Sequence, residues 1–217
     1  HVEGYESFED AIAGQPSEPI ADRMEASDML YSSGTTGQPK GVKVTAPDVP
    51  LGTPPALLML LAMLFGVTDG CKYLSPAPLY HAAPLRFCMN VQRVGGTVVV
   101  MERFDPAHAL QTIEQHQITT RPWVPTMFVR LLKLPEDVRN RYDLSSLRFV
   151  VHAAAPCPPD VKRRMIDWWG PVINEYYGGT ETGAVFVHTS EEALRKPGTV
   201  GRQIPGAAGR NVVANRQ

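Results

Sequence analysis

Residues 31–42 decide the fold of this chain, and they read Tyr31-Ser32-Ser33-Gly34-Thr35-Thr36-Gly37-Gln38-Pro39-Lys40-Gly41-Val42. Glycines let successive backbone N–H groups point toward one place, and such concave backbone nests bind anions. Serine and threonine hydroxyls add donors and can also reach a magnesium ion. Lys40 supplies a positive charge, so the stretch predicts a phosphate-binding loop. A turn rich in Gly, Ser and Thr between two elements is the plain alternative.

The spacing in this loop differs from that of the common nucleotide loop G-x-x-x-x-G-K-[ST]. Gln38 and Pro39 separate Gly37 from the lysine, and Gly41 follows the lysine where a hydroxyl residue would be needed. The sequence therefore predicts a phosphate loop of another kind.

Composition excludes several classes of function. The chain has 217 residues, of which 43% are hydrophobic and 20% charged, and its net charge is −1. These values are those of an ordinary globular protein and leave no basic footprint for nucleic acid. The longest apolar run, 57–67, is too short to span a bilayer and does not have the place or basic flank of a signal peptide. We expect a cytoplasmic protein with no integral membrane segment.

The three cysteines, Cys71, Cys88 and Cys157, are far apart and form no C-x-x-C pair. This argues against a disulfide framework and a zinc site, and it fits a reducing compartment. We interpret all three as small residues of the core or of a pocket wall.

Helix and strand patterns alternate through most of the chain. Such alternation predicts an α/β fold, in which helices cover both faces of a largely parallel sheet. We expect a lead-in segment at 1–27 with a helix near 5–13, a core at 28–206 and an irregular tail at 207–217. The expected helices are 56–65, which should be buried, 84–94, one that starts at Asp105-Pro106, 127–134 and 158–169. The expected strands are 72–74, 97–101, which should be buried, 120–124, 147–152 and 172–177.

Four loops follow strand ends in this scheme. They are the phosphate loop, Pro78–His81, Ala153–Pro156 and Tyr177–Glu181. Ligands of such sheets bind outside the carboxyl ends of the strands. We therefore expect a composite site at one edge of the sheet.

These segments resemble the signatures of the adenylate-forming enzymes, such as acyl-CoA synthetases, aryl-CoA ligases and peptide-synthetase adenylation domains. YSSGTTGQPKGV at 31–42 matches their loop YTSGTTGxPKGV, and 176–181 is similar to their YGxTE. Ala153–Pro156 resembles their Gly-Ala-Pro segment, PAPLYHAAP at 76–84 an aromatic-His motif, and 198–206 their G-[ST]-V-G-x-x-x-P-G. The resemblance implies that this chain belongs to the large N-terminal domain of such an enzyme.

The resemblance also implies roles for residues. Catalytic roles fall to Lys40, Thr180 and Glu181, and magnesium to Thr35 and Glu181. The implied ATP-binding residues are Ser32, Ser33, Gly34, Thr35, Thr36, Gly37, Lys40, Ala154, Ala155, Tyr176, Tyr177, Gly178 and Thr180. The implied acyl pocket is Tyr80, His81, Ala83 and Phe87, and Arg103 would lie near CoA.

Plainer readings of these residues stay open. Segment 178–181 could be a turn that caps a helix, and Ala153–Pro156 could be merely a turn. His81 could be a hydrogen-bonded core histidine, and Arg103 an ordinary surface arginine.

The implied reaction is activation of a carboxylic acid. The acid, a fatty or related acyl acid, would react with ATP and Mg²⁺ to give acyl-AMP and pyrophosphate, and CoA would then displace AMP. A carboxylate is already ionised at neutral pH and needs no general base. The sequence has no G-x-S-x-G motif and no Cys/His pair, in agreement with this chemistry.

The sequence departs from the family pattern in several places. Lys43-Val44-Thr45 stands where many relatives carry a Ser/Thr-His-x-Asn element. The chain ends at Gln217, before the ribose-binding Tyr-x-Thr-Gly-Asp motif, the hinge and the C-terminal domain with its catalytic lysine. Little precedes the phosphate loop. We therefore expect this chain alone to be inactive and prone to self-association.

Two rival functions remain. An amino-acid adenylation domain needs a carboxylate near the acyl motif to pair with the substrate ammonium, but residues 79–87 contain no acid. A non-catalytic nucleotide-binding module is the other alternative. Fatty, bile-type and aryl acids all fit the sequence.

Overall fold

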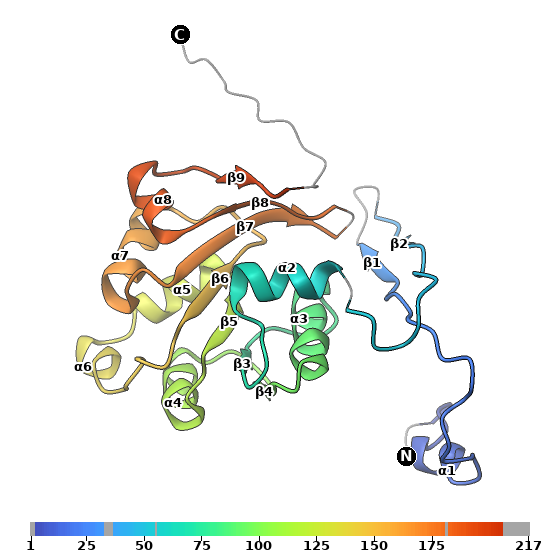
Figure 1. Ribbon diagram of the computed structural model, residues 1–217. Helices are drawn as coiled ribbons and strands as arrows, with labels where there is room; N and C mark the ends of the chain where they lie inside the picture. The colour runs from blue at the N-terminus through green and yellow to red at the C-terminus, as the bar shows by residue number, and fades with distance from the viewer. Residues whose placement is uncertain (1–2, 33–36, 55, 181, 206–217) are drawn as a thin grey trace. The chain divides into compact units, whose positions relative to one another are not determined.

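The structure, a computed structural model, describes residues 3–32, 37–54, 56–180 and 182–205 (Figure 1). The chain divides into two compact units. Residues up to 29 and 43–54 form the first, and residues 30–42 and from 55 onward form the second. The phosphate-loop segment thus belongs to the same unit as the large sheet.

The first unit contains little regular structure. Its helix α1 (Phe8–Ile12) begins after Ser7, whose hydroxyl accepts a hydrogen bond from the Asp10 N–H group. A single bridge joins Met24 to Pro50, and the Glu25 carboxylate accepts a 2.6 Å hydrogen bond from Gly52 N–H. The expected helix near 5–13 is present but short.

The second unit is built on a seven-stranded sheet with the order β4-β3-β5-β6-β7-β8-β9. Strands β3 to β7 are parallel, whereas β8 and β9 extend the sheet in antiparallel fashion. The strands are β3 (Lys72–Ser75), β4 (Thr97–Val100), β5 (Thr120–Trp123), β6 (Phe149–His152), β7 (Ile173–Gly179), β8 (Gly183–His188) and β9 (Arg202–Gln203). The largely parallel sheet is confirmed, but β8 and β9 have no counterpart in the sequence-based prediction.

Helices cover both faces of this sheet, as predicted (Figure 1). One core layer packs residues of α4, α5 and α7 against Leu74, Val150 and Ile173. The other packs α2 and α3 against the alternate strand positions Tyr73 and Val151. The helices are α2 (Ala56–Phe65), α3 (Ala82–Arg93), α4 (Pro106–His116), α5 (Pro125–Leu132), α6 (Glu136–Arg139), α7 (Pro159–Trp169) and α8 (Ser190–Arg195).

Local chemistry sets where several helices begin. Asp105 caps α4 by accepting a hydrogen bond from His108 N–H, and Pro106 occupies its first turn, as the sequence predicted. At α8, the Thr189 hydroxyl and the Glu192 carboxylate form a reciprocal capping box.

Two predictions about burial are wrong. Helix α2 has the predicted bounds but only one buried side, because Met59 and Met63 are 64% and 69% exposed. Strand β4 is an edge strand instead of a buried one, and Val100 is 53% exposed. Apolar composition alone does not tell a covered face from an uncovered one. Cys71 and Cys88 are buried core residues, as expected.

Candidate functional site

A cavity of about 350 Å³ opens at the carboxyl ends of β5, β6 and β7. Its volume is in the range of small-molecule sites. Seven of the residues predicted for ATP or the acid line it: His81, Ala83, Phe87, Ala154, Tyr176, Gly178 and Thr180. Three of the four predicted loops therefore meet at one cavity.

Most of the remaining cavity wall is apolar and was not predicted. Helix α2 contributes Leu57, Leu60 and Phe65, and the turn from β5 into α5 contributes Trp123 and Met127. The residues of the β5–α5 turn could have been inferred from their position, because Trp123 ends a strand at the same edge of the sheet. Such a wall suits the apolar part of an organic acid.

Backbone geometry shapes the cavity at two places. A Cβ atom on Gly178 would lie 1.8 Å from the carbonyl oxygen of Gly183, so only glycine fits where β7 meets β8. Ala154 has φ +72°, which is rare for a residue with a side chain. Strained backbone of this kind gathers at functional sites.

Outside the phosphate-loop segment, four described residues of the predicted site do not line this cavity. Tyr80 is 81% exposed and contacts the His81 ring at a centroid distance of 4.5 Å. Tyr177 is 57% exposed and packs beside Phe186. Alternation along a strand explains this, because Tyr176 and Tyr177 point to opposite faces. Ala155 and Arg103 are exposed in loops after β6 and β4.

The phosphate-loop segment forms a separate antiparallel hairpin. Strands β1 (Leu30–Ser32) and β2 (Lys40–Val42) pair so that Ser32 faces Lys40 across the hairpin. Lys40 is exposed, and Gly37 has φ +79° in a bend with open space around it. The residues Ser33, Gly34, Thr35, Thr36 and Glu181 lie outside the described residues. Their roles, magnesium binding included, stay predictions.

Comparison with known proteins places this geometry in a family. The model of the AMP-binding enzyme family matches residues 3–212. The chain belongs to the AMP-binding enzymes.

Two relatives of this AMP-binding enzyme chain are named as CoA ligases. It is 32% identical over 179 residues to a long-chain-fatty-acid–CoA ligase of Bacillus subtilis, covering 82% of this chain and 31% of the relative. It is 34% identical over 184 residues to 4-coumarate–CoA ligase 1 of Oryza sativa subsp. japonica, covering 80% and 31%. The chain thus spans about a third of the curated relatives it matches.

A solved structure supports the fold assignment. The o-succinylbenzoate CoA synthetase of Bacillus subtilis, in complex with ATP and magnesium ion, superposes with a TM-score of 0.69 at 27% identity. The match covers 90% of this chain and 40% of that one.

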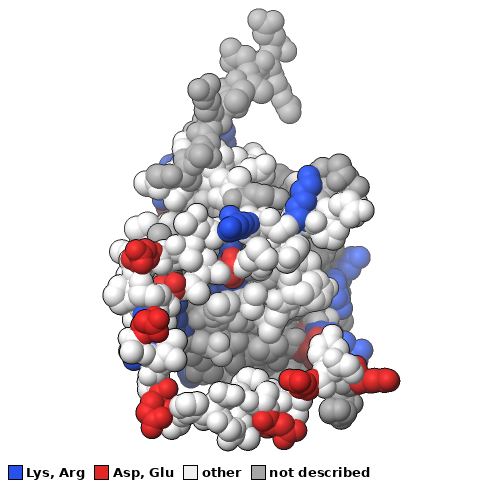
Figure 2. Space-filling view, turned by 90° about the vertical axis from the view of Figure 1, so that its right-hand side faces the viewer, with Lys and Arg blue, Asp and Glu red and all other residues white. Residues whose placement is uncertain are grey.

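Within the described residues of the AMP-binding chain, no helix is long and apolar enough to cross a membrane. Figure 2 shows acidic and basic side chains scattered among uncharged residues over one face.

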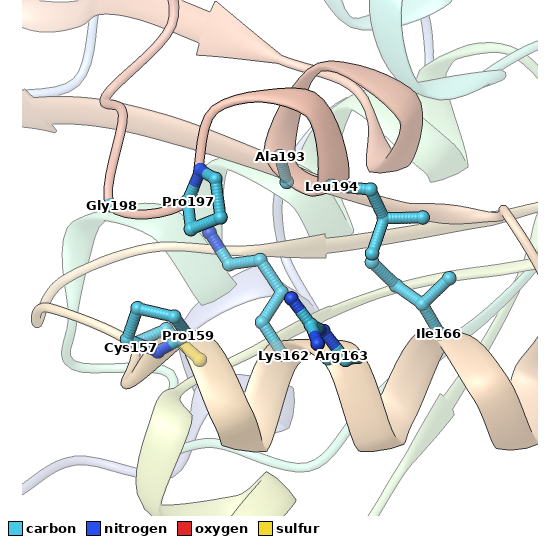
Figure 3. A pocket seen from close by; sticks show the side chains of 9 residues that line it. All are labelled: Cys157, Pro159, Lys162, Arg163, Ile166, Ala193, Leu194, Pro197 and Gly198. Atoms are coloured by element: carbon cyan, nitrogen blue, oxygen red, sulfur yellow. The ribbon is translucent and has the colours of Figure 1, made fainter.

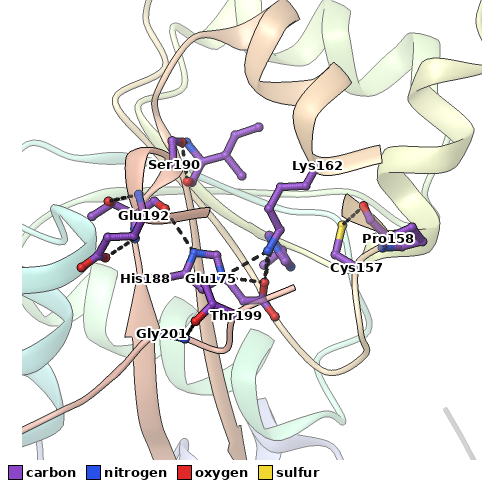
Figure 4. A network of polar contacts seen from close by, with 12 residues as sticks. Cys157, Pro158, Lys162, Glu175, His188, Ser190, Glu192, Thr199 and Gly201 are labelled. Atoms are coloured by element: carbon purple, nitrogen blue, oxygen red, sulfur yellow. Dashed lines mark hydrogen bonds and ion pairs between the residues drawn. The ribbon is translucent and has the colours of Figure 1, made fainter. Parts of the chain in front are cut away.

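A second constellation, not predicted from the sequence, lies on the face of the sheet that α7 covers, and its His152 also lines the cavity (Figure 4). The Glu175 carboxylate accepts a hydrogen bond from Lys162 Nζ of α7. His188 Nε2 lies 2.9 Å from the same carboxylate oxygen and 3.1 Å from Lys162 Nζ. His152 Nε2 lies 3.3 Å from that oxygen without hydrogen-bond geometry. All four residues are buried, and we call them the buried clamp. The available signal was a histidine at the end of β6 and of β8 and a glutamate within β7.

Burial and charge set the protonation of the clamp. Burial alone raises the pKa of Glu175, but the His188 hydrogen bond and the neighbouring His152 and Lys162 outweigh it and hold this pKa at about 2. Burial lowers the pKa of His152 from 6.5 to about 3, against the opposing pull of Glu175. At neutral pH the clamp therefore holds a carboxylate beside a neutral His152.

A small cavity of about 20 Å³ adjoins Lys162 between α7, α8 and Pro197-Gly198 (Figure 3). It has room for about one water molecule. Cys157 also lines it, and burial raises the pKa of that thiol to about 11. Cys157 is therefore a protonated wall residue, in agreement with the sequence-based interpretation.

Proposed function

We propose that the intact protein activates an apolar carboxylic acid with ATP, forming acyl-AMP and pyrophosphate, and then transfers the acyl group to CoA. One observation carries the proposal: an apolar cavity at the strand ends is bordered by Ala154, Tyr176 and Thr180, which belong to two family signatures. The names of the fatty-acid and coumarate ligases among the relatives support the same class of reaction. A cytoplasmic location is part of this proposal.

The cavity supplies binding and orientation. Helix α2, Phe87 and Trp123 would hold the apolar body of the acid and exclude water from it. His81, the residue before α3, is one of the polar residues that line this cavity, and we assign it to the substrate carboxylate. No general base is needed, because the carboxylate is the nucleophile as it binds.

The hairpin segment would neutralise the phosphates. We assign Lys40 and the N–H groups of residues 33–37 to the phosphate chain, where positive charge makes pyrophosphate a better leaving group. A magnesium ion would add charge neutralisation there, with Thr35 and Glu181 as the ligands that the resemblance implies. Arg103 is assigned to the approach of CoA on the resemblance alone.

Pyrophosphate exchange in the intact protein tests this function. ATP would be incubated with labelled pyrophosphate and with fatty, aryl and amino acids in parallel. We expect exchange with apolar acids and a loss of at least about 100-fold on Glu181→Ala, the usual effect of removing one preorganised electrostatic group. Glu191→Gln, an exposed acid on α8, is the matched control and should keep full activity.

Two results would contradict the proposal. ATP binding without exchange for any acid would favour the non-catalytic nucleotide-binding module. Exchange confined to amino acids would favour a peptide-synthetase adenylation domain.

A further inference from the structure

The buried clamp lies in a single row across the sheet. Trp123 of β5 is registered opposite His152 of β6, His152 opposite Glu175 of β7, and Glu175 opposite His188 of β8. Lys162 reaches the row from α7, which covers this face. The Glu175 carboxylate on β7 therefore bonds to side chains of β8 and α7, and His152 of β6 lies beside it without a hydrogen bond.

The residues next to this row border the proposed substrate cavity. Val151 and Ala153 flank His152, and Tyr176 follows Glu175; all three line the cavity. Side chains alternate between the faces of a strand, so these neighbours point to the face opposite the clamp. His152 of the clamp itself also lines the cavity. The ring of Tyr176 also lies 6.0 Å from that of Phe65 on α2. A shift of β7 against β6 would therefore move the cavity wall.

We propose that Glu175, held by Lys162 and His188, is a positioning residue that fixes β7 against α7 and β8, at the point where its ladder with β6 ends, for substrate binding. This inference rests on the function proposed above. The parallel ladder between β6 and β7 ends at the pair His152–Glu175, so backbone pairing does little to hold β7 against β6 beyond this point. A charge-assisted hydrogen bond to a buried carboxylate restricts such displacements, since a buried charge without its partner is strongly unfavourable.

The test separates positioning from simple stabilisation. Lys162→Met and Glu175→Gln each break the clamp, and each single variant should be less stable because it leaves one group without its partner. The double variant Lys162→Met/Glu175→Gln removes both charges and should recover much of the stability. For this double variant in the intact protein, we expect KM for the acid to rise at least about 10-fold, and kcat to fall, at a temperature well below unfolding.

A destabilised control makes this comparison decisive. Ile113 is fully buried in α4 and does not line the cavity. Ile113→Ala should lower stability as much as a single clamp variant without changing KM. If the double variant is stable and keeps wild-type KM and kcat, Glu175 has no positioning role.

Amide hydrogen exchange distinguishes failure of this inference from failure of the proposed function. We expect the double variant to exchange faster than wild type at 153–156 and 176–180 without any ligand, and Ile113→Ala to leave these segments unchanged. Unchanged exchange in the double variant would overturn the inference. Absence of pyrophosphate exchange in the wild-type protein would instead overturn the proposed function.

Discussion

Arg121 allows a test of whether the cost of burying a charged side chain is offset by its contacts with aromatic rings. It lies on β5 with no exposed surface, and its Nε, Nη1 and Nη2 atoms have no hydrogen-bond partner within the described part of the chain. The guanidinium carbon stands 4.3 Å from the ring centroids of both Trp123 and Trp169. Burial lowers the pKa of Arg121 well below its usual value. The two indole rings are thus the compensation that the structure shows for a desolvated charge.

The magnitudes favour replacement of this arginine. Two desolvated cation–π contacts contribute about 2 kcal/mol each. The effective cost of burying an ion is several kcal/mol, and each buried donor without a partner adds about 1–3 kcal/mol. We therefore expect Arg121→Met, which keeps the length and the packing, to raise the free energy of unfolding by about 1–3 kcal/mol. The unfolding entropy of 217 residues is about 0.46 kcal/mol/K, so 2 kcal/mol corresponds to about 4 °C in Tm.

Urea unfolding followed by circular dichroism measures this change, because Trp fluorescence would respond to the substitution itself. Arg121→Lys is the matched control. It keeps a buried charge but loses the planar stacking, so it should be less stable than wild type. If Arg121→Met unfolds at lower urea than wild type, the stacked guanidinium is net stabilising and the reasoning is refuted.

Three further predictions concern pH, backbone space and phosphate. His152 and Glu175 both have lower pKa values in the folded protein than in the unfolded chain, so the unfolded chain binds more protons as the pH falls. The free energy of unfolding should therefore fall by several kcal/mol from about pH 6.5 toward 3. His152→Leu should flatten the upper part of this decline in urea titrations at a series of pH values. Gly178→Ala should cost about 1–3 kcal/mol in thermal unfolding because its Cβ meets the Gly183 backbone, whereas Gly14→Ala, in open space, should cost nothing. Lys40→Ala should raise KM for ATP about 10- to 150-fold and leave KM for the acid unchanged, the loss of one charge-assisted contact of about 1.5–3 kcal/mol; a change confined to the acid would reassign the loop.

The fold was predictable where local signals agreed. Asp105-Pro106 specified a helix start, and β-branched or apolar runs gave the parallel strands from 72 to 177 with errors of one or two residues. The antiparallel strands β8 and β9 were not predicted: β9 has only two residues, and β8 directly follows the Tyr177–Glu181 loop. The burial of individual apolar residues could not be predicted either. Met63 and Val100 are apolar but exposed, because the packing of distant elements decides which apolar face is covered.

The buried clamp shows why part of the polar core could not be read from the sequence. Lys162 and Glu175 are 13 residues apart, and Lys162 and His188 are 26 apart, so no motif spacing connects them. A lysine on a helix and a glutamate in a strand each suggest an exposed face. Only the register of β6, β7 and β8 brings their side chains to one place.

The contrast between short contiguous motifs and residues brought together from distant elements also explains why the sequence indicates a class of reaction but not the acid. Ala154, Tyr176 and Thr180 belong to short segments that resemble family signatures, so they can be found from the sequence alone. The cavity wall that would contact the acid comes from Leu60 on α2 and Trp123 on β5, which belong to no signature. An apolar wall binds by shape, so many combinations of side chains can serve one acid. Substitutions on α2 and at the β5–α5 turn should therefore change the preferred acid while the affinity for ATP is kept.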